Sequence, residues 1–132
     1  MPPSKTTNRR RVLVVDDEPM VTEWLKMVVE QAERSPGYEV RVAAVGSRAV
    51  ELFRSWRPDV VLLDIVLPDI DGIALLRELK AIDPGPEMIV ISGVGTITRA
   101  LEAGQAGAFY FIEKSNLDPA GLLSILDRAA SL

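Results

Sequence analysis

The 132-residue chain contains neither cysteine nor histidine. Without cysteine there are no disulfides and no thiolate metal sites. Without histidine there are no imidazole bases, phosphoacceptors or metal ligands, so any reaction must rely on carboxylates, hydroxyls and lysines. Long apolar runs are also missing, since Val60–Leu63 and Met88–Ile91 are far shorter than the roughly 18–20 residues of a membrane-spanning helix. The polar start, Met1–Arg11, lacks the apolar core of a secretory signal, and we expect a cytoplasmic protein without membrane association.

The overall composition is that of one ordinary globular domain. Apolar residues make up 48% and charged residues 26% of the chain, which is typical of a packed domain, and the length suits a single core. The net charge of −4 gives no general attraction to nucleic acid. The basic run Arg9–Arg11 is more simply explained as solvated residues before the first strand. We therefore expect no direct binding of nucleic acid.

Short apolar runs alternate with stretches of helical spacing along the chain. Several runs are continuous rather than alternating, which is typical of a parallel sheet covered on both faces. The expected strands are Val12–Val15, Tyr38–Val42, Val60–Leu63, Met88–Ile91 and Phe109–Ile112. The apolar residues expected to face the core from helices are Val21, Trp24, Leu25, Val28 and Ala32; Ala49, Val50 and Phe53; Ile73, Leu76 and Leu79; Ile97, Ala100 and Leu101; and Leu122, Leu123, Leu126 and Ala129. We predict an open α/β fold with five strands and five helices.

Ionisable and hydroxyl side chains follow four of the five predicted strands. The first strand ends in Asp16–Glu18, the third in Asp64, the fourth in Ser92 and the fifth in Lys114. Parallel strands bring these ends to one edge, where open α/β folds bind ligands, so we expect the side chains to converge. Close carboxylates repel one another unless a cation lies among them. Mg2+ suits such a site, because it prefers carboxylates, water and phosphate oxygens.

These residues lie in five motifs that together resemble the receiver domains of bacterial response regulators. The motifs are Val14–Pro19, Leu62–Pro68, Asp71-Gly72, Ile91–Gly93 and Phe111–Lys114. The resemblance spans about residues 10–130, and the motifs are specific in combination. It implies a flavodoxin-like, doubly wound, five-stranded parallel sheet in the order 2-1-3-4-5 with five helices. The implied division is a flexible tail over residues 1–9 and a receiver domain over residues 10–132.

The resemblance also implies a phosphoacceptor and a metal site. Asp64 is the expected phosphoacceptor. The expected protein ligands of Mg2+ are Asp16, Asp17, Asp64 and the backbone carbonyl of Val66. A sensor histidine kinase or a phosphotransfer protein would donate the phosphoryl group. The receiver would catalyse only its own phosphorylation and dephosphorylation, so we do not expect an enzyme with a separate substrate.

Three further side chains have roles implied by the resemblance. Ser92 and Lys114 would bind the phosphoryl oxygens, and Ser92 together with Phe111 would form a conformational switch. Phosphorylation would shift an equilibrium between two conformations and alter the face made by the fourth helix, fifth strand and fifth helix. That change would alter the binding of a downstream effector domain or protein. The same face could also mediate a homodimer.

One position departs from the family pattern. Ser115 follows Lys114 where the family usually has a proline with a cis bond. A cis bond before serine costs about 2.5–4 kcal/mol, against roughly 0.5–1 before proline, so a trans bond and a less firmly placed lysine are expected.

Val66 and Val94 lie two positions after Asp64 and Ser92, where family members tune the lifetime of the phosphoaspartate. The apolar side chains of these two residues cannot orient an attacking water. We therefore expect slow spontaneous dephosphorylation.

Other interpretations fit parts of the pattern. A degenerate receiver that binds partners without phosphorylation is favoured only by Ser115. A metal-dependent phosphatase that uses an aspartyl phosphate would resemble a pattern with two aspartates one residue apart, which Asp16–Glu18 does not match. A dinucleotide site would need a glycine-rich turn in place of these acids. The aspartates could also simply cap the next helix, and Ser92 could begin a turn.

Overall fold

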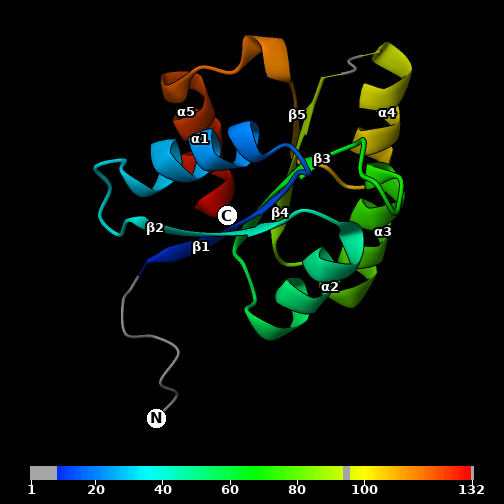
Figure 1. The fold of residues 1–132 in the computed structure, drawn as a ribbon, viewed down its shortest axis with the longest axis horizontal. Coiled ribbons are helices and arrows are strands. Elements are labelled where there is room, and N and C mark those ends of the chain that lie inside the picture. Colours follow the sequence, from blue (N-terminus) through cyan, green and yellow to red (C-terminus); the bar gives the residue numbers. More distant parts are fainter. Residues whose placement is uncertain (1–8, 94–95, 132) are drawn as a thin grey trace.

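The computed structural model describes residues 9–93 and 96–131, and its strands form one parallel sheet (Figure 1). The strands are β1 (Arg10–Val15), β2 (Tyr38–Ala43), β3 (Val60–Asp64), β4 (Glu87–Ser92) and β5 (Tyr110–Glu113). Their order in the sheet is β2-β1-β3-β4-β5, and every neighbouring pair is parallel. The predicted flavodoxin-like topology is therefore confirmed.

Helices cover both faces of the sheet. They are α1 (Pro19–Glu30), α2 (Gly46–Ser55), α3 (Gly72–Ile82), α4 (Ile97–Gln105) and α5 (Pro119–Ala130), with a short 3-10 helix (Lys114–Asn116) directly after β5. In Figure 1, α1 and α5 lie on one side of the sheet, while α2, α3 and α4 lie on the other. Each helix connects two parallel strands or follows the last one, as this fold requires.

The central strands explain why the apolar runs are continuous. Leu13 and Val15 pack toward α2 and α3, whereas Val12 and Val14 pack toward α1 and α5. All four side chains are at most 1% exposed. Fully burying such a side chain contributes about 1.5–3 kcal/mol, so both faces of the strand favour apolar residues.

Two helical faces differ from the prediction. In α1, Leu25 and Val29 are fully buried, Val28 is only half-buried and Ala32 lies beyond the end of the helix. The prediction missed Val29 and included Ala32, whereas Leu25 is buried as predicted and Val21, Trp24 and Val28 are partly buried against the core.

The predicted core face of α4 was wrong. Ile97 and Leu101 are 81% and 62% exposed, and Ala103 is the buried residue. Ala103 packs in the core cluster on the α2 and α3 side of the sheet, and the larger apolar residues Ile97 and Leu101 lie on the outer face of α4.

Two further predictions concern the start of the chain and the absence of membrane-spanning helices. The predicted tail over residues 1–9 lies outside the described residues, apart from Arg9, and β1 begins at Arg10. Within the described part of the chain, no helix combines the length and apolar character needed to cross a membrane.

Candidate functional site

The strand ends bring the predicted pocket residues together at one edge of the sheet. Asp64 is the last residue of β3 and Ser92 the last of β4, while Asp16 and Lys114 directly follow β1 and β5. In the sheet, Asp64 of β3 pairs with Ile91 of β4, the residue that precedes Ser92. Asp16, Asp64 and Ser92 are 3%, 4% and 0% exposed, so the floor of the pocket is polar although it is buried.

Three carboxylates form an oxygen-only cluster. Asp16, Asp17 and Asp64 each place an oxygen within 4.8 Å of the others. Asp16 and Asp64 are buried and Asp17 is exposed, so the cluster opens to solvent on one side. The Asp16 carboxylate is oriented by the backbone N–H of Glu18, which donates to its Oδ1 at 2.9 Å. This donor set fits a divalent cation that prefers oxygen ligands.

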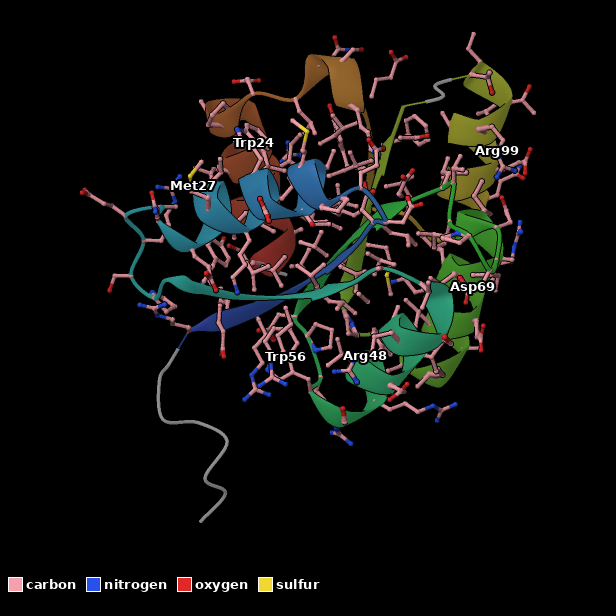
Figure 2. All side chains as sticks on the ribbon, in the orientation of Figure 1. Trp24, Met27, Arg48, Trp56, Asp69 and Arg99 are labelled. Atoms are coloured by element: carbon pink, nitrogen blue, oxygen red, sulfur yellow. The ribbon has the colours of Figure 1, made fainter. Side chains whose placement is uncertain are left out.

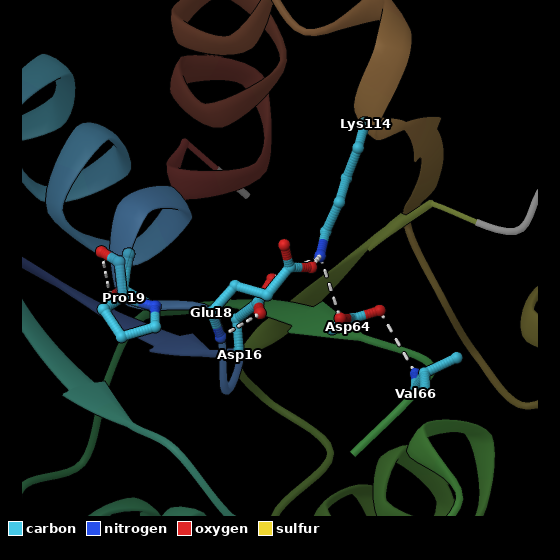
Figure 3. Close-up of polar contacts among 7 residues, drawn as sticks. Asp16, Glu18, Pro19, Asp64, Val66 and Lys114 are labelled. Carbon is cyan, nitrogen blue, oxygen red and sulfur yellow. Dashed lines mark hydrogen bonds and ion pairs between the residues drawn. The ribbon is translucent and has the colours of Figure 1, made fainter.

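Lys114 reaches into this cluster from the other side of the pocket (Figure 3). Its Nζ lies 2.9 Å from Asp16 Oδ2, 3.0 Å from Asp64 Oδ2 and 2.5 Å from Glu18 Oε1. Partial burial disfavours the charged lysine, but the hydrogen bonds to Glu18, Asp16 and Asp64 outweigh it and raise the pKa of Lys114. The lysine is therefore a fixed positive charge at neutral pH.

Asp64 carries a negative charge that its surroundings only partly compensate. Burial raises its pKa, hydrogen bonds from Lys114 and the Val66 amide oppose that effect, and the nearby charge of Asp16 adds to it. The Val66 amide donates to Asp64 Oδ1 at 3.1 Å. A second cation beside Asp64 would stabilise the ionised form of its carboxyl group. The role of the Val66 carbonyl as a metal ligand stays a prediction.

The loop after β3 holds the acceptor close to the start of α3. A Cβ atom on Gly72 would lie 2.2 Å from the Asp64 carbonyl oxygen and 2.5 Å from Ile65 Cα. The Gly72 N–H donates to the Ile65 carbonyl at 2.6 Å, and the preceding Asp71 caps α3 by accepting from the Ala74 N–H. The Asp71-Gly72 motif is therefore explained by this close approach.

The loop is also joined to two helices. Asp69 accepts hydrogen bonds from the N–H groups of Gly46 and Ser47 at 2.8 and 3.1 Å, and these bonds lower the pKa of Asp69. It thereby caps α2, whose own N-cap residue supplies no side-chain hydrogen bond. Asp71 forms an ion pair with Arg99, which Figure 2 labels on α4. Sequence reasoning missed both contacts, because each joins segments more than twenty residues apart.

The remaining predicted residues lie where the fold leads us to expect them. Gly93, directly after Ser92, lies beside Lys114, since a Cβ on it would be 3.8 Å from the lysine Cδ. Phe111 is half-buried against the core on the α2 and α3 side, while Tyr110 is 45% exposed. Val94 lies outside the described residues, so the predicted slow dephosphorylation stays a prediction.

The Lys114–Ser115 bond is trans, as expected, since the cis bond among the described residues is Ser35–Pro36. Lys114 begins the 3-10 helix that follows β5. Its contact with Glu18 was not predicted, although Glu18 lies within one of the motifs. The two residues are 96 positions apart, and no local pattern pairs them.

Comparison with known proteins assigns this arrangement to a family. A sequence model described as the response regulator receiver domain matches residues 12–127. The chain belongs to the response regulator receiver family. Receivers are signalling modules of two-component systems, in which they interact with histidine kinases and effector domains.

Individual relatives support the assignment over nearly the whole receiver. The chemotaxis protein CheY of Thermotoga maritima is 36% identical over 122 residues, which cover 92% of this chain and 98% of that protein. The regulatory protein AtoC of Escherichia coli is 36% identical over 123 residues, but the match covers only 25% of AtoC.

Solved structures have the same fold. A CheY-like receiver from Methanospirillum hungatei has a TM-score of 0.85 at 27% identity, with 94% of this chain and 95% of that chain covered. The BeF3-activated N-terminal receiver domain of Klebsiella pneumoniae RstA has a TM-score of 0.84 at 27% identity, with 93% and 100% covered.

Proposed function

We propose that this receiver accepts a phosphoryl group on Asp64 from a sensor histidine kinase or a phosphotransfer protein, and that Mg2+ is the metal it requires. The observation that carries the proposal is the convergence on Asp64. This buried carboxylate meets a lysine at 3.0 Å and shares an oxygen cluster with Asp16 and Asp17. An aspartate that lies between a lysine ammonium and a candidate metal site suits transfer of an anionic phosphoryl group, because both cations would stabilise its negative charge.

The chemistry follows from the contacts of the pocket. A carboxylate oxygen of Asp64 forms a bond to phosphorus while the bond from phosphorus to the donor imidazole breaks, and its electron pair stays on the imidazole nitrogen. Lys114 keeps its proton and offers its positive charge to the phosphoryl oxygens. Ser92 would donate its hydroxyl hydrogen to one of them. Mg2+ held by Asp16, Asp17, Asp64 and the Val66 carbonyl would reduce the repulsion between acceptor and phosphoryl group.

The donor must reach Asp64 through the open side of the pocket. An apolar groove lined by Met20, Val21, Trp24 and Leu117 borders Lys114 there, and Met20 is 85% exposed. A donor protein in the cytoplasm could cover this groove while its phosphohistidine enters the pocket. The groove thus supports a protein as the physiological phosphodonor.

The proposed output is a change in the face formed by α4, β5 and α5. Ile97, Leu101 and Tyr110 are exposed on these elements, so the face already offers apolar surface to an effector or to a second copy of the chain. Phosphorylation would replace the contact between Asp64 and Lys114, and Ser92 and Phe111 would adjust to the phosphoryl group. The effector, rather than this chain, would carry any direct contact with nucleic acid.

The alternative of a receiver that works without phosphorylation is not favoured. Each pocket position carries the residue that the family's chemistry uses, and Lys114 reaches Asp64 even though Ser115 follows it.

Intact-mass measurement after incubation with acetyl phosphate and MgCl2 tests the proposal. The wild-type chain should gain one phosphoryl group, and neither Asp64→Asn nor a sample treated with chelator should gain any. An unchanged wild-type mass, under conditions that modify a known receiver run alongside, would favour the module that binds partners without phosphorylation.

A further inference from the structure

Glu18 and Lys114 form a contact that the proposed chemistry does not use. The distance from Lys114 Nζ to Glu18 Oε1 is 2.5 Å, the shortest of the three ion pairs of this lysine. Glu18 lies between β1 and α1, and its side chain is 58% exposed, whereas the lysine is 15% exposed. The contact therefore joins the segment between β1 and α1 to the residue that follows β5, as Figure 3 shows.

The other two partners of Lys114 have competing roles. Asp16 and Asp64 belong to the oxygen cluster, and Glu18 does not. A metal ion in the cluster would be bound by oxygens of both aspartates, and in phosphorylated Asp64 one carboxylate oxygen would be bonded to phosphorus. Glu18 is the partner of Lys114 that could stay in place through each of these states.

The main chain holds the backbone of Lys114, whose carbonyl accepts from the Leu117 N–H at 3.2 Å, but it does not fix the position of the ammonium. The bond to Ser115 is trans, and Ser115 and Asn116 are both exposed. The flexible stem of a lysine has several rotatable bonds, so its ammonium needs an anchor to stay in one position.

Glu18 is held at its backbone by three hydrogen bonds. Its N–H donates to Asp16, and its carbonyl accepts from the N–H groups of Val21 and Thr22 at 3.1 Å each. Pro19 begins α1 immediately after it. The carboxylate of Glu18 therefore extends from a well-anchored main chain.

We propose that Glu18 is a positioning residue that holds the Lys114 ammonium facing Asp64, in a chain that lacks the proline after this lysine. The inference rests on the proposed function, since it assigns a purpose to the position of the lysine. Glu18 neither ligates the metal nor touches the phosphoryl group. Its removal should loosen the lysine and slow phosphorylation without weakening metal binding.

The test compares Glu18→Gln with Glu23→Gln, a matched control on the exposed side of α1 that removes the same charge. The first readout is the NMR order parameter of the Lys114 Cε methylene in protein with 13C-labelled lysine. The chain has four lysines, so the spectrum is simple. Lys80 provides an internal reference, because its Nζ donates to the Pro84 and Pro86 carbonyls at 3.1 Å each.

We expect the Lys114 order parameter to fall in Glu18→Gln and to stay unchanged in Glu23→Gln, with Lys80 constant in both. The phosphorylation rate with acetyl phosphate should fall roughly three- to tenfold in Glu18→Gln only, a size suited to a half-exposed ion pair. The affinity for Mg2+, measured by titration, should fall much less than in Asp17→Asn, since Glu18 lies outside the cluster.

Each other outcome has a definite meaning. An unchanged order parameter would overturn the inference, as would a phosphorylation rate equal to that of the wild type. A loss of Mg2+ affinity as large as that of Asp17→Asn would place Glu18 among the metal ligands and would also overturn it. If the wild-type chain takes up no phosphoryl group while the order parameter still falls, the proposed function fails but the positioning contact stands.

Discussion

At the scale of single residues, Asp64 is a carboxylate whose charge the folded chain disfavours. Burial raises its pKa despite the hydrogen bonds from Lys114 and the Val66 amide. A raised pKa means that the folded state holds the proton more tightly than the unfolded state does. The resulting stabilisation is present below the ordinary aspartate pKa and is lost as the pH rises through the raised value. Without metal, ionised Asp64 therefore lowers stability at neutral pH.

Asp64→Asn should accordingly raise the free energy of unfolding at neutral pH in the presence of chelator, by about 0.5–2 kcal/mol. The gain should shrink as the pH falls toward the ordinary range of aspartate, because the wild-type carboxyl then takes up its proton. Urea unfolding of both chains at several pH values measures the difference. A variant that is less stable than the wild type at neutral pH would contradict this account of the pocket.

The acidic cluster predicts a second effect at this scale. Mg2+ that binds only the folded chain should stabilise it by about 1.4 kcal/mol at a free concentration tenfold above its Kd. Asp17→Asn should lose most of this gain, because it removes an exposed ligand while the buried residues stay in place. The measurement is the urea midpoint with and without Mg2+. Equal stabilisation of both chains would exclude the cluster as the metal site.

At the scale of elements, the start of α3 packs against the end of β3 too closely for any side chain at Gly72. Gly72→Ala should lower the free energy of unfolding by about 1–3 kcal/mol, because the new Cβ would overlap main-chain atoms of Asp64 and Ile65. It should also slow phosphorylation by displacing the acceptor.

Gly104 in α4 provides the matched control. A Cβ there meets no atom within 4 Å, so Gly104→Ala should stabilise the helix by about 0.5–1 kcal/mol. Urea unfolding distinguishes the two substitutions. A mild effect of Gly72→Ala, similar to that at Gly104, would mean that the close approach does not constrain the loop.

The ion pair between Asp71 and Arg99 links α4 to the loop that carries the acceptor. The helix buries only Ala103 fully, so this contact should contribute to its position. Arg99→Ala should speed amide hydrogen exchange in α4 by roughly two- to fivefold, as expected for a partly exposed ion pair. Arg77→Ala, on the exposed side of α3, is the control. Unchanged exchange in α4 would show that the pair does not hold the helix.

At the scale of the whole molecule, the open α/β architecture was predictable because its causes are local, whereas the strand order was implied by the resemblance to receiver domains. Strands buried on both faces leave continuous apolar runs such as Val60–Leu63, and right-handed connections leave few arrangements for five such runs. The pocket was predictable for the same reason, since Asp16, Asp64, Ser92 and Lys114 each lie at the end of a strand or directly after it, and parallel strands end together.

What could not be predicted depends on contacts between distant segments. The outward face of α4, with Ile97 and Leu101 exposed and Ala103 buried, depends on which side of the helix packs against its neighbours, and periodicity alone does not reveal that. The contact of Glu18 with Lys114 depends on side-chain conformations in the segments that follow β1 and β5. Sequence patterns identify which residues gather in the pocket, but not which side chains pair within it.

The most direct test of the central claim locates the phosphoryl group on the chain. Borohydride reduces an aspartyl phosphate to homoserine, and tandem mass spectrometry then identifies the changed residue. After incubation with acetyl phosphate and Mg2+, we expect homoserine at position 64 and none when the metal is chelated. Homoserine at Asp16 or Asp17, or its absence from every aspartate, would contradict the assignment of Asp64 as the phosphoacceptor.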